Sequence, residues 1–239
     1  MRKDKNTQAL RTLTIFANCG AFLFFPSNFY YIMEEYQMNH KRTQKLYTIA
    51  VVAVMSALSA VLMYIQIGIP FVPSFLKFDF SELPALMTAF AISPWAGIIV
   101  SLAKNVLHLF ATATMGVGEL SNFLMSASFV FFAGLIYHKM KSRKGALIGS
   151  AVGTLVSALV SFPVNYFITY PVFFVIFAPK EIILDAYHML IPAIDSLPKA
   201  LLIVNMPLTA VKGIACAAIT FLIYKPLSPI LKGKWLKKS

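Results

Sequence analysis

Apolar residues in this chain are gathered into long runs, and most polar residues fall in the short segments between them. A helix rises about 1.5 Å per residue, so about 20 apolar residues cross the ~30 Å hydrocarbon core of a bilayer. The runs predict an all-α integral membrane bundle of six transmembrane helices, at about residues 47–66, 81–93, 94–112, 119–137, 145–172 and 207–224.

The second helix, at about 13 residues, is too short to cross a bilayer alone. The segment before it, residues 68–80, carries two prolines and four phenylalanines and ends at charged positions. We expect this segment to dip into the membrane and to form a capping loop over a pocket, because irregular backbone at that depth is tolerated only beside protein or a cavity.

Short local signals predict where two helices begin. Ser93 is a suitable N-cap, and Pro94 suits the first helical position, where a missing N–H costs nothing. Ser81 is a candidate cap for the short second helix, while Asp79 and Glu82 suit the positive end of its dipole.

Composition excludes an ordinary soluble domain, because 59% of the residues are hydrophobic and only 13% are charged, against about 25% charged in soluble proteins. The net charge of +12 could suit nucleic acid, but the cations cluster beside apolar spans, at residues 41–45, 138–144 and 225–239. With six spans these three segments share one side, which the positive-inside rule places in the cytoplasm. We therefore expect a multi-pass cell-membrane protein whose core has both termini inside and no nucleic-acid partner.

Residues 1–40 differ from the rest of the chain. They contain an apolar stretch, but Asn18, Gly20, Pro26 and Asn28 make it a poor seventh span. The sequence predicts an interfacial or poorly ordered leader at 1–40 and a six-helix transmembrane substrate-binding domain at 41–239.

Several polar side chains fall within the apolar spans, all in the half that this topology places toward the outside. Ionised groups at membrane depth usually face a cavity or a partner, so these residues predict a single pocket open to the outside. For three of them we favour an internal polar network that supports the loop. The full set is Lys104, Asn105, His108, Glu119, Asn122, Asn165 and Lys212, and the first three are the network candidates.

Five segments together resemble a known family, the riboflavin-binding S components of energy-coupling factor (ECF) vitamin transporters. They are PFVPSFLKFDFSELPAL, SPWAGIIVSLAKNVLHL, GVGELSNFL, NYF at residues 165–167, and Lys212-Gly213. The resemblance covers about residues 47–224, and it is specific as a set rather than segment by segment. The sequence differs from the family pattern around Lys212 and in a long outer loop expected from Pro179 to Met206.

The resemblance implies a vitamin-capture subunit that is not an enzyme and needs no cofactor, with riboflavin as its transported ligand. Such a subunit docks on a separate transmembrane coupling protein driven by two cytoplasmic ATPases. The sequence agrees in that it contains no GxxxxGK[ST] phosphate-binding loop.

The resemblance also assigns the ligand contacts, to Glu119, Leu120, Asn165 and Lys212, with Asn122 and Thr209 as further candidates. The chemistry suits a flavin, because Asn165 both donates and accepts, Glu119 accepts, and Lys212 donates hydrogen bonds. Three structural alternatives stay open: Glu119 could only cap its helix, Lys212 could extend to the outer surface, and Asn165 could join two helices.

Small residues form two stripes that allow helix backbones to approach closely in lipid. Ala53 and Ala57 lie on the first span, and the resemblance assigns them to the interface with the coupling protein. A ladder of glycine and serine on the fifth span is assigned to internal packing: Gly145, Gly149, Gly153, Ser157 and Ser161. The alternative is that both stripes pack the bundle.

Two other classes of function are weighed against this one, besides an S component for another vitamin. A proton-coupled small-solute carrier could use Lys104, His108 and Glu119 as a relay, but the chain shows no internal repeat of the kind such transporters have. A membrane enzyme would need a nucleophile with a base or a metal cluster, and the four histidines lack metal-ligand spacing.

Overall fold

The computed structural model describes residues 27–68, 77–112 and 114–231, with side chains described for 42–68, 78–112 and 114–223. The chain separates into two compact units, Met1–Leu46 and Tyr47–Ser239, and the site lies in the second. Residues 1–26 of the predicted leader lie outside the described residues, while residues 27–40 are helical. The interfacial placement of the leader stays a prediction.

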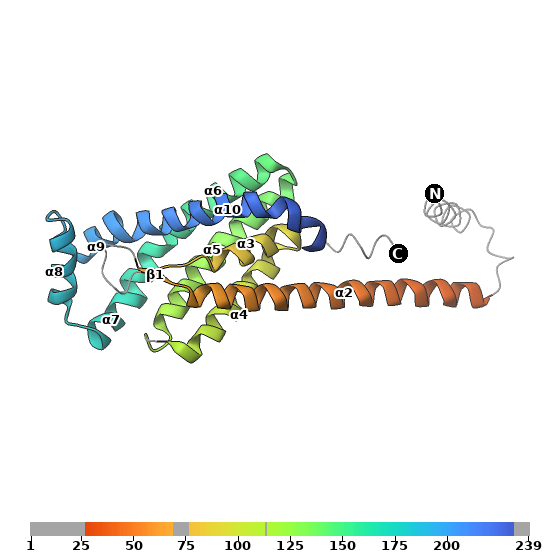
Figure 1. Ribbon diagram of the computed structural model, residues 1–239, viewed down its shortest axis with the longest axis horizontal. Coiled ribbons are helices and arrows are strands. Elements are labelled where there is room, and N and C mark those ends of the chain that lie inside the picture. The colour runs from red at the N-terminus through yellow and green to blue at the C-terminus, as the bar shows by residue number, and fades with distance from the viewer. Residues whose placement is uncertain (1–26, 69–76, 113, 232–239) are drawn as a thin grey trace. The chain divides into compact units, whose positions relative to one another are not determined.

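Within the described residues the fold is all-α apart from one antiparallel pair of two-residue strands (Figure 1). The predicted fold class is therefore confirmed. In chain order the elements are α2 (Ser27–Tyr64), β1 (Ile67–Gly68), β2 (Lys77–Phe78), α3 (Glu82–Ala91), α4 (Pro94–His108), η1 (Leu109–Ala111), α5 (Val117–Met140), α6 (Arg143–Val164), η2 (Asn165–Thr169), α7 (Tyr170–Ile176), α8 (Lys180–Leu190), α9 (Leu197–Ala200), η3 (Leu201–Asn205) and α10 (Met206–Leu231).

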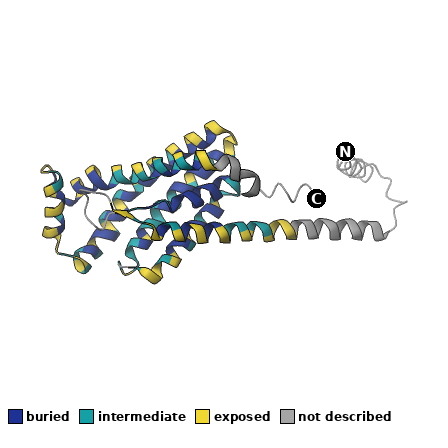
Figure 2. Cartoon of the chain, viewed as in Figure 1, coloured by how far each residue is buried: buried dark blue, intermediate teal, exposed yellow. Residues whose placement is uncertain are grey.

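Five of the six predicted spans are helices long and apolar enough to cross a membrane. In the described residues they are Arg42–Tyr64, Pro94–Ala111, Val117–Met140, Arg143–Ile176 and Leu197–Ile223. The predicted second span corresponds to α3, whose 10 residues are too few to cross. It packs instead against α4, α5 and α10, and every residue from Glu82 to Phe90 is buried (Figure 2).

The predicted capping loop lies largely outside the described residues, because residues 69–76 are not described. On either side of it, β1 pairs with β2 in antiparallel register, with Ile67 opposite Phe78. The ends of the loop are therefore held together next to the start of α3.

Of the two predicted helix caps, only one forms. Ser93 adopts an extended backbone and accepts a hydrogen bond from the Ala96 N–H at 3.1 Å, with Pro94 at the first helical position, as predicted. Ser81 precedes α3 but makes no side-chain cap bond, so that prediction is wrong. The reason is that its hydroxyl accepts a hydrogen bond from Lys104, whose buried ammonium group requires acceptors.

Two π-helical turns allow the last two spans to continue through prolines. In η2 the Tyr170 N–H donates to the carbonyl of Asn165, five residues back, and Pro171 follows. In η3 the Met206 N–H donates to the carbonyl of Leu201, and Pro207 follows. A proline lacks an N–H and its ring crowds the carbonyl one turn earlier, and a wider turn at that point relieves both problems.

The prediction of a long outer loop at 179–206 is wrong for most of that range. It contains α8, and the last span begins at Leu197, ten residues earlier than predicted. In Figure 1, α8 lies at one end of the bundle beside α7 and α9, and this end is called the α8 end below. Tyr170 of α7, Tyr187 of α8 and Asn205 of η3 are joined by mutual hydrogen bonds, with 3.0 Å from each tyrosine oxygen to the Asn205 amide.

The glycine ladder packs α6 closely against α5, as predicted. A Cβ placed on Gly149 would lie 2.5 Å from the backbone oxygen of Ala133, and one on Gly153 would lie 2.6 Å from that of Phe129. These separations are shorter than any van der Waals contact, so only glycine fits at either position.

Candidate functional site

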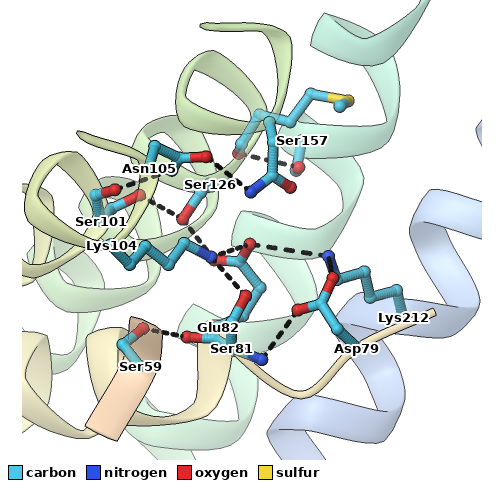
Figure 3. A network of polar contacts seen from close by, with 12 residues as sticks. Ser59, Asp79, Ser81, Glu82, Ser101, Lys104, Asn105, Ser126, Ser157 and Lys212 are labelled. Carbon is cyan, nitrogen blue, oxygen red and sulfur yellow. Dashed lines mark hydrogen bonds and ion pairs between the residues drawn. The ribbon is translucent and has the colours of Figure 1, made fainter. Parts of the chain in front are cut away.

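Four charged side chains meet inside the bundle, contributed by the segment before α3 and by α3, α4 and α10 (Figure 3). Lys104 Nζ lies 2.7 Å from Glu82 Oε1, and Lys212 Nζ lies 2.9 Å from Asp79 Oδ2. Lys212 Nζ also lies 3.8 Å from Glu82 Oε1, which joins the two pairs into one cluster. The four are called the charge cluster below.

The charge cluster is electrically balanced, since it holds two carboxylates and two ammonium groups. Balance matters because burying an isolated ion is costly. The Lys104 side chain is 0% exposed, and the Lys212 side chain is 18% exposed. Burial alone would raise the pKa of Asp79, but the neighbouring ammonium groups of Lys212 and Lys104 outweigh it and lower that pKa to about 2. Asp79 therefore stays ionised and holds Lys212 in place.

Serine hydroxyls connect the charge cluster to the surrounding helices. Lys104 Nζ donates to Ser81 Oγ at 2.7 Å, and Ser126 on α5 donates to Glu82 Oε2. Ser101 donates to Ser126, and Ser59 on α2 donates to the Ser81 carbonyl. Figure 3 shows these residues pointing toward one another. Lys104 thus belongs to an internal polar network, as the sequence predicted.

A small cavity of about 60 Å³ borders the charge cluster between α3, α5, α6 and α10. Three of the six predicted ligand contacts line it: Asn122, Thr209 and Lys212. The remaining lining residues are Glu82, Met125, Ser126, Phe129, Ser157 and Gly213. Asn122 also donates to the Asn105 oxygen at 3.0 Å, so the amides of α4 and α5 are joined at this depth.

Glu119 lies in a separate cluster at the start of α5. Its carboxylate accepts hydrogen bonds from Thr112 Oγ1 at 2.8 Å and Thr114 Oγ1 at 2.9 Å, and it lies 2.8 Å from Nδ1 of His108. These contacts join the end of α4 and the segment after it to the start of α5. Leu120 is 49% exposed, and neither Glu119 nor Leu120 lines the small cavity.

Asn165 is buried at the first position of η2, and its Nδ2 donates to the carbonyl of Ser161 at 2.8 Å. It does not line the small cavity, although Ser157, two turns earlier on α6, does. Lys104 and Glu119, two of the three residues of the hypothetical proton relay, thus lie in different clusters, and His108 joins the second.

Sequence reasoning identified Lys212 but missed its partners. Asp79 and Glu82 were assigned to the dipole of a short helix, yet their carboxylates hold Lys212 and Lys104. The available signal was charge balance: two lysines within apolar spans require two buried carboxylates, and few acidic residues lie inside the core sequence.

Ala53 and Ala57 lie one turn apart on α2, and both are exposed. With exposed Val54 and Leu58 they form an uncovered apolar face within the described part of the helix. Their predicted contact with a coupling protein stays a prediction.

Comparison with known proteins gives consistent matches. A family model described as the substrate-specific component of ECF transporters matches residues 47–224. The chain is 33% identical over 196 residues to the riboflavin transporter RibU of Staphylococcus aureus (strain TCH60), which covers 82% of this chain and 96% of that protein. It is also 33% identical over 107 residues to the riboflavin transporter FmnP of Bacillus subtilis (strain 168), covering 44% of this chain and 56% of that protein.

A solved structure gives the same result at the level of the fold. It is described as the S component of a bacterial ECF transporter, and it matches with a TM-score of 0.63 and 32% sequence identity over 79% of this chain and 99% of that one. The carrier and enzyme alternatives are therefore set aside. The chain belongs to the ECF transporter family as a substrate-specific, or S, component.

Proposed function

We propose that this S component captures riboflavin in a site around Lys212 and delivers it for import. The observation that carries the proposal is the position of Lys212, held by Asp79 at a cavity that Asn122 and Thr209 also line. Such a site lies in a chain whose relative, aligned over 96% of its own length, is a riboflavin transporter.

The polar groups of this region suit the heterocyclic edge and the ribityl hydroxyls of riboflavin. Lys212 donates, Asn122 both donates and accepts, and Thr209 carries a hydroxyl. Glu119 and Leu120 precede Asn122 by three and two residues on α5, and Asn165, at the start of η2, follows Ser157 of α6 by about two turns. We therefore propose that these three residues extend the same site toward the α8 end of the bundle.

The size of the cavity sets a condition on capture. About 60 Å³ holds one or two waters, whereas small-molecule sites typically span about 300–1,000 Å³. Riboflavin would fit within this cavity of described residues only if the walls around Lys212 separated. The ion pair that joins Lys212 on α10 to Asp79 before α3 is the contact such a movement must rearrange.

We further propose that the basic segments lie in the cytoplasm and that the α8 end faces outside. The transporter module would comprise a transmembrane coupling protein and two cytoplasmic ATPases, with Ala53 and Ala57 contacting the coupling protein. The exposure of both alanines on α2 supports this assignment, because small exposed residues allow a partner helix to approach closely.

Binding by site variants tests the ligand assignment. Asn165→Ala and Lys212→Ala should each weaken riboflavin binding by about 1–3 kcal/mol, the effect of losing a buried hydrogen bond. Lys199→Ala serves as a control, because its side chain is 51% exposed and pairs with Asp195 outside the small cavity. Unchanged affinity in both site variants would move the binding site elsewhere.

Uptake by surface variants tests the coupling assignment separately. Ala57→Trp should leave riboflavin binding by the purified chain intact and abolish uptake in cells that contain the coupling protein and ATPases. Ile99→Trp is the control, since Ile99 is 55% exposed on α4. Loss of binding by isolated Ala57→Trp, or normal uptake with it, would contradict the assignment.

A further inference from the structure

A larger cavity of about 410 Å³ lies at the α8 end, apart from the charge cluster. It is bounded by η2, α7, α8 and the start of α9, and it shares no lining residue with the cavity at Lys212. Its volume is within the range of small-molecule sites, about 300–1,000 Å³. The residues that line it are Tyr166, Phe167, Pro171, Phe174, Lys180, Leu184, Asp195, Ser196, Leu197 and Pro198.

The walls of this cavity differ in chemistry according to their place along the spans. The aromatic residues Tyr166, Phe167 and Phe174 lie within the membrane-capable segment that ends at Ile176. Phe167 is 71% exposed and lies about 13 Å along the helix from that end. The wall within the membrane is therefore apolar and open to the hydrocarbon region.

The polar residues of the cavity lie beyond the ends of the spans. Lys180 begins α8 after the segment ending at Ile176, and Asp195 and Ser196 come just before the next segment, which begins at Leu197. An occupant in contact with both walls would have its polar part at the level of the lipid headgroups and its apolar part in the hydrocarbon region. Only an amphiphile meets both requirements.

The charges at the polar end favour an anionic headgroup. Asp195 is paired with Lys199 at 2.6 Å, so its charge is compensated locally. Lys180 is exposed, and among the described residues no salt bridge to it is found. Among the residues that line the cavity, Lys180 is therefore the one charged group without an ion-pair partner, while Glu181 and Asp185, exposed on the same helix, do not line it. Basic groups between membrane helices attract lipid phosphates.

We propose that this cavity is a binding site for an anionic phospholipid. Its phosphate lies at Lys180 with the Ser196 hydroxyl as a further donor, and an acyl chain follows Phe167 and Phe174 into the membrane. A lipid in this position contacts α7, α8 and α9 together and helps to hold α8 against the end of the bundle. The inference does not depend on riboflavin as the ligand of the other site.

Native mass spectrometry of delipidated, detergent-purified full chain, titrated with phosphatidylglycerol, tests the proposal. Two variants address the two parts of the site. Lys180→Glu reverses the charge at the rim, and Leu184→Trp fills the cavity without changing charge. Each should weaken phosphatidylglycerol binding by about tenfold, which for the charge reversal is the effect of one or two headgroup-level charges. Lys144→Glu, an exposed position near the opposite end of α6, is the matched control and should bind as the unmodified chain does.

Further arms of the titration separate the sources of binding. Glycerol 3-phosphate should not displace the lipid, because it lacks the acyl chain, and phosphatidylcholine should bind more weakly than phosphatidylglycerol. If Leu184→Trp lowers the melting temperature, Phe167→Ala replaces it, since it removes the ring from an exposed wall and puts no charge in the hydrocarbon region.

Equal binding by the unmodified chain, Lys180→Glu and the cavity variant would overturn the proposal, as would displacement by glycerol 3-phosphate. Riboflavin binding measured on the same samples reports on the other site. Absence of lipid binding with riboflavin binding retained would mean that the lipid proposal alone fails. Absence of riboflavin binding with lipid binding retained would mean that the riboflavin proposal alone fails.

Discussion

The ion pair between Lys212 and Asp79 offers a direct test of the charge cluster. Lys212→Met removes the ammonium group and leaves the Asp79 carboxylate without its nearest cation. Asp79→Asn removes the carboxylate and leaves the Lys212 ammonium group without its nearest anion. Both changes keep the side-chain volume roughly constant. The double variant removes both charges and leaves Glu82 paired with Lys104 at 2.7 Å.

The structure sets the expected magnitude. Breaking a fully buried ion pair costs about 3–5 kcal/mol, because one buried charge loses its partner. Lys212 retains 18% exposure and has a second carboxylate at 3.8 Å, so we expect each single variant to lose about 2–3 kcal/mol. At about 2–4 °C per kcal/mol for a domain of this size, the melting temperature should fall by about 4–12 °C.

The assay is thermal unfolding of detergent-purified variants, followed by the circular dichroism of the helices. The double variant should be more stable than the sum of the two single changes predicts, by a coupling of about 1–3 kcal/mol. Riboflavin binding should nevertheless stay weak in the double variant, because Lys212 is still missing. Additive losses in the double variant would refute the reasoning, since they would mean that the two charges do not stabilise one another.

Three further predictions concern the packing of α6 against α5, the pKa of Asp79 and the hydrogen bonds of Tyr187. Gly153→Ala should lower the melting temperature, because its Cβ would lie 2.6 Å from a backbone oxygen of α5, whereas Gly68→Ala, with nothing within 4 Å, should have little effect; equal shifts would contradict the close packing. The Asp79 pKa is lowered to about 2, so its stabilising contribution is complete above its unfolded value near 3.8 and is lost as the pH falls toward 2. The stability difference between the unmodified chain and Asp79→Asn should therefore be constant from pH 7 to about 5 and shrink below about 4; a difference that shrinks already between pH 7 and 5 would refute this. Tyr187→Phe should cost about 1–3 kcal/mol in thermal unfolding because it leaves buried polar partners unsatisfied, while Tyr166→Phe, at a half-buried tyrosine, serves as the control that should change little.

Local signals in the sequence predicted much of the fold. Ser93 and Pro94 mark a helix start by themselves, since a cap and a first-turn proline act within a few residues. The beginning of the last span was misplaced because Pro198 and Pro207 and the charges of Asp195 and Lys199 resemble a loop. A π-helical turn that accommodates Pro207 depends on tertiary packing, which no local pattern reveals.

The candidate site was predictable only in part, for a related reason. A lysine within an apolar span is conspicuous, so Lys212 could be found from the sequence. Its partner Asp79 lies 133 residues away in the chain, and only the folded arrangement joins them. Glu119 was equally conspicuous, but its three hydrogen-bond partners around the α4–α5 turn became evident only from the structure.

Titration of the detergent-purified chain with riboflavin, followed by quenching of flavin fluorescence, tests the central claim most directly. The account predicts saturable binding of one riboflavin per chain, weakened in Lys212→Ala and unaffected in Lys199→Ala, with no competition by thiamine. Absence of saturable riboflavin binding, or the same affinity in Lys212→Ala as in the unmodified chain, would contradict it.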